Sequence, residues 1–149
     1  DMIRAKPLMK IQVITEMSEV DFGEDLTVKF HRTDHAIPCY AMEISDGKTT
    51  ILYGADSGPD TVWEQMGTGH DLVVLEATYL EKNLPSNPSG HLSAKQAGYV
   101  AEAMKAKSLL LTHLYPTYDR QQVIREAKEA YSGNCMVAEI GLTIDFNNS

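Results

Sequence analysis

The order of apolar and polar positions along the chain predicts a mixed β-sheet. Four segments either alternate in polarity or are rich in β-forming residues: 10–16, 26–32, 39–45 and 49–55. Asp46-Gly47 separates the last two and favours a hairpin with a two-residue turn, because both central positions of a type I′ turn need positive φ. Two closing segments, 135–140 and 142–146, are also predicted strands.

Two continuous apolar runs, 71–77 and 108–114, are typical of strands buried on both faces. Between them a helix is predicted over 93–107, where Ser93 and Gln96 have capping-box spacing. Further helices are predicted over 57–69 and 119–134, with Gly133 just past the end of the second. We therefore expect one α/β domain over residues 1–149, with one mixed β-sheet covered by about three helices and at least one right-handed β-α-β crossover.

Titratable side chains stand where these elements end. The hairpin places His35 and Asp56 at the same edge of the sheet, while Glu76 and His113 end the two apolar strands. His91 lies in the loop between those two strand ends. Because ligand sites in α/β sheets form at the carboxyl ends of parallel strands, we expect all five side chains on one rim, provided that 49–55 runs parallel to 71–77.

These residue types favour metal chemistry. Imidazole and carboxylate suit Zn²⁺, Mn²⁺ or Fe, and one aspartate can bridge two ions. A carboxylate–histidine pair, here Glu76 and His91, suits proton transfer. Simpler roles remain open: His35 as a hydrogen-bonded residue at a strand end, Asp56 as a helix cap, His113 as a turn residue, His91 as a loop residue and Glu76 as the partner of a lysine.

Composition narrows the function classes. The net charge is −8 with no cluster of lysine and arginine, which weighs against nucleic acid as a partner. The sequence shows no signal peptide and no membrane-spanning run, and its two cysteines form no disulfide framework, so we expect reduced, buried thiols and a cytoplasmic location. His31 and His70 are expected at the surface. The first residue is Asp1, so we expect a piece of a longer protein.

Five segments in order resemble the C-terminal half of the metallo-β-lactamase superfamily, and most closely its tRNase Z-like metal-dependent hydrolases. They are "DHAIPCYAMEI", "LYGADSGPDT", "LVVLEATY", "SGHLSAKQAG" and "LLLTHLYPTYD". The resemblance implies that His35, Asp56 and His113 are metal ligands, with Asp56 bridging. It also implies that Glu76 is the acidic residue of the "HEAT" segment of tRNase Z, and that His91 is the active-site histidine before the next helix.

The superfamily signature His-x-His-x-Asp-His is absent. "FHRTDH" has Phe30 and Arg32 where that signature has two histidines, and Leu75 replaces the first residue of "HEAT". The resemblance therefore implies one half of a four-layer αββα sandwich, with the signature half outside this chain. Two Zn²⁺ ions are implied for the full-length protein, with Mn²⁺ or Fe as other candidates.

The implied function is hydrolysis of a phosphodiester or other ester by a hydroxide held between two metals, in the full-length protein only. The isolated fragment is expected to be inactive. One alternative is a tRNase Z-type endonuclease that processes the 3′ end of tRNA. Another is a non-catalytic fragment or interaction domain with vestigial metal residues. Because about three helices cover only one face of the sheet, we expect the missing N-terminal half or a self-copy on the other face.

Overall fold

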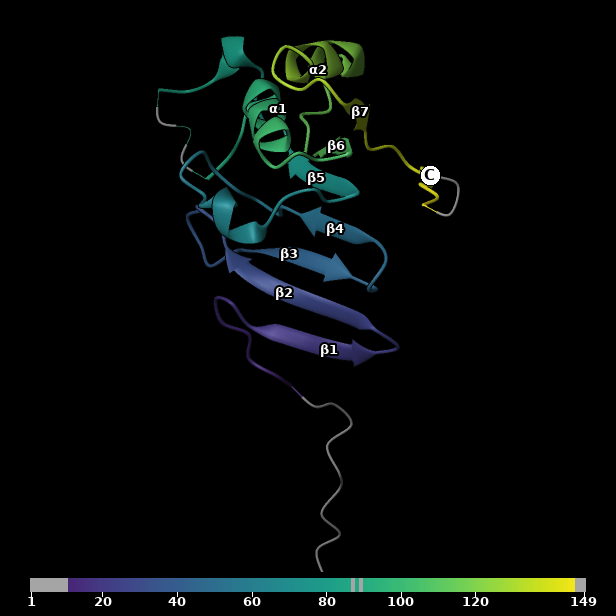
Figure 1. Cartoon of the computed structure of the whole chain (residues 1–149). Coiled ribbons are helices and arrows are strands. Elements are labelled where there is room, and N and C mark those ends of the chain that lie inside the picture. The colour runs from purple at the N-terminus through teal and green to yellow at the C-terminus, as the bar shows by residue number, and fades with distance from the viewer. Residues whose placement is uncertain (1–10, 87, 89, 147–149) are drawn as a thin grey trace, which may run out of the picture.

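The computed structural model describes residues 11–86, 88 and 90–146. Its strands form one mixed sheet in chain order, antiparallel from β1 to β4 and parallel from β4 to β7. The strands are β1 (Glu19–Gly23), β2 (Leu26–Arg32), β3 (Tyr40–Ser45), β4 (Thr50–Tyr53), β5 (Leu72–Glu76), β6 (Ser108–Thr112) and β7 (Asn134–Val137). The helices are α1 (Ala94–Ala103), α2 (Arg120–Ala127) and the 3-10 turns η1 (Trp63–Met66) and η2 (Glu81–Asn83) (Figure 1).

The α/β prediction and the central strands are confirmed, and β7 confirms most of the strand predicted over 135–140, whereas the first and the last of the predicted strands are wrong. Over 11–15 there is no strand, and β1 begins only at Glu19. The predicted strand over 142–146 is also absent from the described residues. Both segments have β-rich sequences, but a strand forms only where a neighbouring ladder accepts its hydrogen bonds.

The two-residue turn lies at a different hairpin from the one predicted. Glu24 and Asp25 both have positive φ and join β1 to β2, as a type I′ turn requires. The β3–β4 hairpin instead pairs Ser45 with Thr50, so four residues connect its strands. The Asp46 carboxylate accepts hydrogen bonds from two backbone amides of that loop, at 2.7 and 3.0 Å, and this widens the turn.

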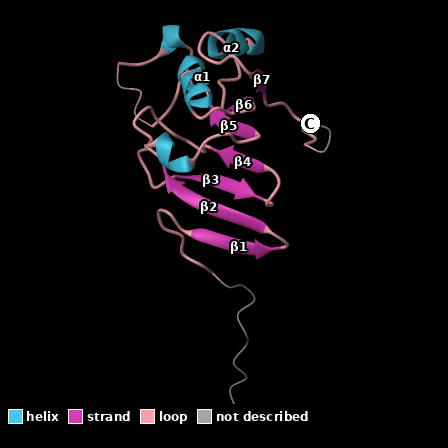
Figure 2. Cartoon of the chain, in the orientation of Figure 1, coloured by secondary structure: helices cyan, strands magenta, loops and turns pink. Residues whose placement is uncertain are grey.

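The helices are shorter than predicted (Figure 2). The capping box is present at α1, where Ser93 Oγ accepts from the Gln96 amide and the Gln96 side chain accepts from the Ser93 amide. The segment 57–69 contains only the 3-10 turn η1. Helix α2 ends at Ala127 rather than near Gly133, although Tyr131 is still buried as its periodicity predicted.

The two faces of the sheet differ in burial. On the face packed against α1 and α2, alternate strand residues such as Leu52, Val73 and Leu109 are fully buried. On the opposite face, residues such as Phe30 and Met42 are only partly buried. None of the described helices is both long enough and apolar enough to cross a membrane.

The expectation that His31 and His70 are surface residues is wrong, because each is 3% exposed. His31 lies on the same face of the sheet as Ala41, its partner in β3, and that face is the covered one. Its Nε2 is 3.5 Å from Glu43 Oε2. Burial lowers the pKa of His70, and the nearby Glu43 and Asp71 carboxylates oppose that shift.

Acid is therefore expected to destabilise the fold through His70. Because its pKa is lower in the folded state, the unfolded chain binds more protons below the ordinary imidazole pKa of about 6.5, and stability falls as the pH drops through that value. Urea unfolding between about pH 7.5 and 5.5 measures this. The unfolding midpoint should fall more steeply in the wild type than in His70→Gln; parallel curves would contradict the interpretation.

Candidate metal centre

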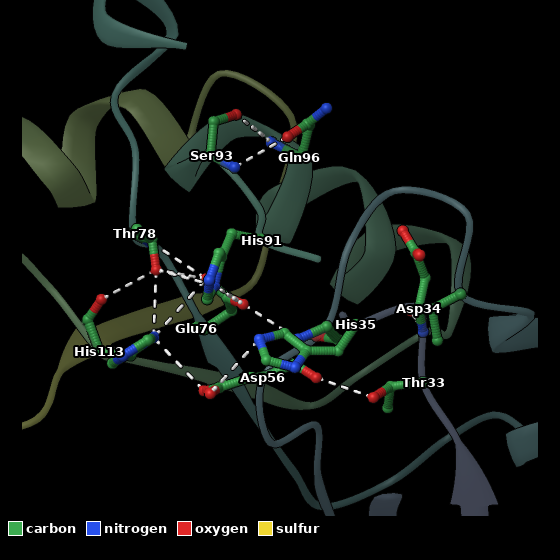
Figure 3. A network of polar contacts seen from close by, with 12 residues as sticks. Thr33, Asp34, His35, Asp56, Glu76, Thr78, His91, Ser93, Gln96 and His113 are labelled. Atoms are coloured by element: carbon green, nitrogen blue, oxygen red, sulfur yellow. Dashed lines mark hydrogen bonds and ion pairs between the residues drawn. The ribbon is translucent and has the colours of Figure 1, made fainter. Parts of the chain in front are cut away.

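The five predicted site residues meet at one rim of the sheet (Figure 3). Strands β4, β5 and β6 are parallel, so Asp56, Glu76 and His113 follow or end strands at the same edge. His35 reaches this edge from the loop after β2, and His91 from the loop before α1. The predicted convergence is present, even though the hairpin register on which it was partly based differs.

Asp56 lies between two histidines. Its Oδ2 is 3.8 Å from His35 Nε2, and its Oδ1 is 3.4 Å from His113 Nδ1. The carboxylate is 42% exposed, and the Thr33 hydroxyl fixes the backbone below it by donating to the Asp56 carbonyl at 2.8 Å. Each carboxylate oxygen therefore faces a different imidazole, as a bridging ligand would require.

Glu76 is the most buried of the five site residues, with 1% of its surface exposed. Its Oε1 accepts from the Ser57 amide at 2.9 Å and lies 2.8 Å from His91 Nδ1. Its Oε2 accepts from the Thr78 hydroxyl at 2.5 Å. A buried carboxylate is tolerated only when hydrogen bonds replace its water shell, and these contacts supply them. The alternative that Glu76 pairs with a lysine is not what the structure shows.

The loops that carry the site are tightly packed and locally strained. Ala55 and His113 have φ of 52° and 54°, in the left-handed region that costs a non-glycine residue energy. A Cβ on Gly58 would lie 2.7 Å from the Gly90 amide nitrogen, and a Cβ on Gly90 would lie 2.9 Å from the His35 ring. Close packing at these glycines holds the loops of Asp56, His91 and His35 together.

Within the described residues, one group brings three potential ligand atoms within 4.8 Å of one another, and it consists of Glu76, His91 and His113. It shares only His113 with the ligand set that the sequence predicts. The oxygens of Glu76 are already occupied by hydrogen bonds, whereas the Asp56 carboxylate is partly open to solvent. The structure thus groups Glu76 with His91 and His113, whereas the ligand set predicted from the sequence, with Asp56 and His35, is not such a group.

The donor set fits a zinc-type ion but does not complete its coordination. His35, Asp56 and His113 offer imidazole nitrogen and carboxylate oxygen, the ligand atoms that Zn²⁺ prefers alongside thiolate. Zinc usually takes four ligands, so three residues shared between two ions leave positions to be filled from elsewhere. The residues fit the group while pointing to further ligands outside this set.

Sequence analysis missed Thr78, which contacts three residues of the site. Its hydroxyl is 2.5 Å from Glu76 Oε2, 3.1 Å from His113 Nδ1 and 3.5 Å from His91 Nδ1. The signal was present in "LEAT", because residues two apart in an extended segment point to the same side. Ser57 was missed for another reason: it acts through its backbone amide, which no side-chain pattern reveals.

Beside these residues lies a pocket of about 290 Å³, lined by Thr78, Tyr79, His91, His113, Leu114, Tyr115 and Pro116. Its wall is aromatic and apolar, and its only titratable groups besides tyrosines are the two histidines of the site. A substrate group placed here would lie directly against His91 and His113.

The rim gathers three histidines and two carboxylates, residue types that can hold a metal ion, at the carboxyl edge of a parallel part of an α/β sheet. The model of the Beta-lactamase superfamily domain matches residues 2–114 of this chain. The chain therefore belongs to the metallo-β-lactamase superfamily, as its motifs predicted.

Similar proteins and similar solved structures support the same superfamily. The chain is 32% identical over 115 residues to the probable metallo-hydrolase YhfI of Bacillus subtilis, covering 77% of this chain and 47% of that protein. The crystal structure of YhfI superposes with a TM-score of 0.79 at 30% identity, covering 87% of this chain and 53% of that one.

Ribonuclease Z of Halorubrum lacusprofundi is 32% identical over 98 residues, which cover 64% of this chain and 32% of that protein. The short form of human tRNase Z shares the fold, with a TM-score of 0.66 at 24% identity over 85% of this chain and 44% of that one. The chain spans about half the length of YhfI, and less of these two proteins.

Proposed function

We propose that this chain contributes half of the active site of a metal-dependent hydrolase that cleaves a phosphodiester. The observation that carries the proposal is the position of Asp56, with one carboxylate oxygen facing His35 and the other facing His113. These three residues hold the ions, for which we propose zinc. Bound ions would supply an ionised water molecule as the nucleophile.

The residues of this chain perform the remaining tasks. Glu76 Oε1 accepts a hydrogen bond from His91 Nδ1–H at 2.8 Å and so orients the ring, and the carboxylate is buried. To act as the general acid His91 must be the imidazolium, whose charge the Glu76 carboxylate stabilises; its Nε2 proton then passes to the leaving oxygen and the imidazole is left neutral. Tyr79 and Tyr115 limit the space available to the leaving group.

The partly buried apolar face of the sheet supports a second proposal about assembly. We propose that the missing half of the sandwich, or a self-copy, covers this face and supplies the remaining ligands. The isolated chain would then hold metal weakly and turn over no substrate. A cytoplasmic location stays a prediction from the sequence.

The similarity to ribonuclease Z proteins supports one alternative function, cleavage of precursor tRNA. Two features of this chain favour a small diester instead: the net charge of −8 and the replacement of the "HEAT" histidine by Leu75. A surface that grips tRNA would need a basic patch to neutralise phosphates.

The test uses the protein as encoded, with any sequence that precedes this chain, loaded with Zn²⁺ or Mn²⁺. We expect it to hydrolyse bis(p-nitrophenyl) phosphate, to stop in chelator and to recover when metal is returned. Precursor tRNA should remain intact. Cleavage of precursor tRNA would favour the ribonuclease, and a metal-loaded protein that turns over neither substrate would favour the non-catalytic alternative.

A further inference from the structure

The pocket beside the proposed metal centre has walls made largely of planar rings. Of its seven lining residues, four carry such rings: Tyr79, His91, His113 and Tyr115. The two histidines also belong to the polar network in Figure 3. The pocket volume of about 290 Å³ lies near the lower end of the range of about 300–1,000 Å³ for ligand pockets. The pocket therefore suits one compact substituent of a substrate.

Contacts with neighbouring residues hold the tyrosine rings in place. The rings of Tyr115 and Tyr118 lie edge to face, with centroids 5.5 Å apart. The Tyr118 amide donates to the Tyr115 carbonyl at 3.0 Å, and the Asn83 side chain donates to the Tyr118 hydroxyl at 3.3 Å. Tyr79 lies edge to face with the His91 ring, with centroids 6.3 Å apart. Because the rings are already positioned, a ligand would lose little free energy in ordering them.

The charge of the pocket disfavours an anionic substituent. None of the seven described lining residues is a lysine, arginine, aspartate or glutamate. The carboxylates of Asp56 and Glu76 lie 3.4 and 3.8 Å from His113, which lines the pocket, and the whole chain has a net charge of −8. An anion in the pocket would meet repulsion without a lysine or arginine to offset it. The substituent that fits best is therefore uncharged.

An aromatic ring gains more from these walls than an aliphatic ring of similar size. Both rings are uncharged, and both would bury apolar surface against Leu114 and Pro116. Only the aromatic ring also makes edge-to-face or offset contacts with Tyr79 and Tyr115, and such contacts stabilise beyond the buried area alone. The expected difference in affinity is about 2–10-fold.

We propose that this pocket binds an uncharged aromatic ring on a substituent of the phosphodiester, so that Tyr79 and Tyr115 determine specificity. His113 connects the pocket to the proposed ligands, because it lines the pocket and its Nδ1 lies 3.4 Å from Asp56 Oδ1. A phosphate group held at Asp56 would bring a ring on a short link into the pocket. That the ring belongs to a phosphodiester rests on the proposed function, whereas the preference for an aromatic ring is a property of the pocket itself.

The experiment compares two ligands that share a phosphonate group and differ only in their ring, benzylphosphonate and cyclohexylmethylphosphonate. Each is titrated into the ¹⁵N-labelled protein as encoded, loaded with Zn²⁺, and the amide signals are followed by NMR. The amides of Thr78, Tyr79, Leu114 and Tyr115 should shift during both titrations, because these residues line the pocket. We expect benzylphosphonate to bind about 2–10-fold more tightly.

Variants of the tyrosines separate ring recognition from simple burial. Tyr115 is 51% exposed, so Tyr115→Leu should fold, keep an apolar side chain and lower the preference for benzylphosphonate. Combining it with Tyr79→Leu should abolish the preference, whereas Tyr115→Phe keeps the ring and should retain it. Tyr99→Leu is the matched control, because Tyr99 is an exposed tyrosine of α1 that does not line the pocket, and it should leave the preference unchanged.

Equal affinity for the two ligands would overturn the proposal, and so would tighter binding of the cyclohexyl ligand or titrations that leave the pocket amides unshifted. Turnover of methyl benzyl phosphate and methyl cyclohexylmethyl phosphate separates this result from the proposed function. If neither diester is hydrolysed while the benzyl preference in binding holds, the proposed phosphodiester hydrolysis fails and the assignment of the pocket stands. If both diesters are hydrolysed and binding shows no benzyl preference, the hydrolase stands and the assignment of the pocket fails.

Discussion

Replacing Asp56 with alanine is expected to abolish metal-dependent hydrolysis in the protein as encoded. The Asp56 carboxylate faces His35 with one oxygen and His113 with the other, so its removal takes a ligand from both proposed ions at once. Metal stabilisation of transition-state charge is worth several kcal/mol, which corresponds to a loss of about 10³-fold or more in turnover.

The measurement pairs turnover of bis(p-nitrophenyl) phosphate with elemental analysis of the bound metal. Asp60→Ala is the matched control, because Asp60 is an exposed carboxylate in the same loop and is not part of the rim. The control should keep its metal and its activity. Full activity of Asp56→Ala with a normal metal content would end the proposed bridging role.

The second large effect is expected from His91. If this ring delivers a proton to the leaving oxygen, His91→Ala should lower kcat by about 10²–10⁴-fold while metal content stays near wild type. Glu76→Gln should give a loss in the same range, because Glu76 acts through the His91 ring, which it holds at 2.8 Å.

The double variant tests whether the two residues work as one unit. Groups that act together lose activity non-additively, so His91→Ala with Glu76→Gln should be no worse than the more damaged single variant. Additive losses would assign the two residues separate roles. Changing Glu76 also disturbs the hydrogen bonds from Ser57 and Thr78, at a cost of about 1–3 kcal/mol, so circular dichroism must first establish that each variant is folded.

The elements that the sequence predicted well are those whose signals are local. The apolar composition of two short segments was enough to predict β5 and β6. The start of α1 was predicted from Ser93 and Gln96, which are three residues apart. The rim was predictable for a related reason: side chains at the carboxyl ends of parallel strands share an edge whatever the exact register. This is why His35 and Asp56 meet although the β3–β4 turn is two residues longer than expected.

The elements that were missed depend on partners distant in the chain. His31 alternates with its neighbours as a surface residue would, but its face of the sheet is the covered one. Residues 142–146 have strand composition but lack a ladder. The Ser57 amide became part of the site only because the Glu76 carboxylate, 19 residues later, ends a neighbouring strand beside it.

The sequence by itself determined the superfamily, the α/β class, the two buried strands and the five rim residues, because each follows from residue types and spacings within short segments. Only the tertiary structure decided which oxygen of Asp56 faces which histidine and which face of the sheet the helices cover. It also decided that the Glu76 side chain is buried and that its carboxylate forms hydrogen bonds with Ser57, Thr78 and His91. The physical reason is that burial and hydrogen-bond direction depend on groups brought together from distant segments, and only the packed chain sets their distances.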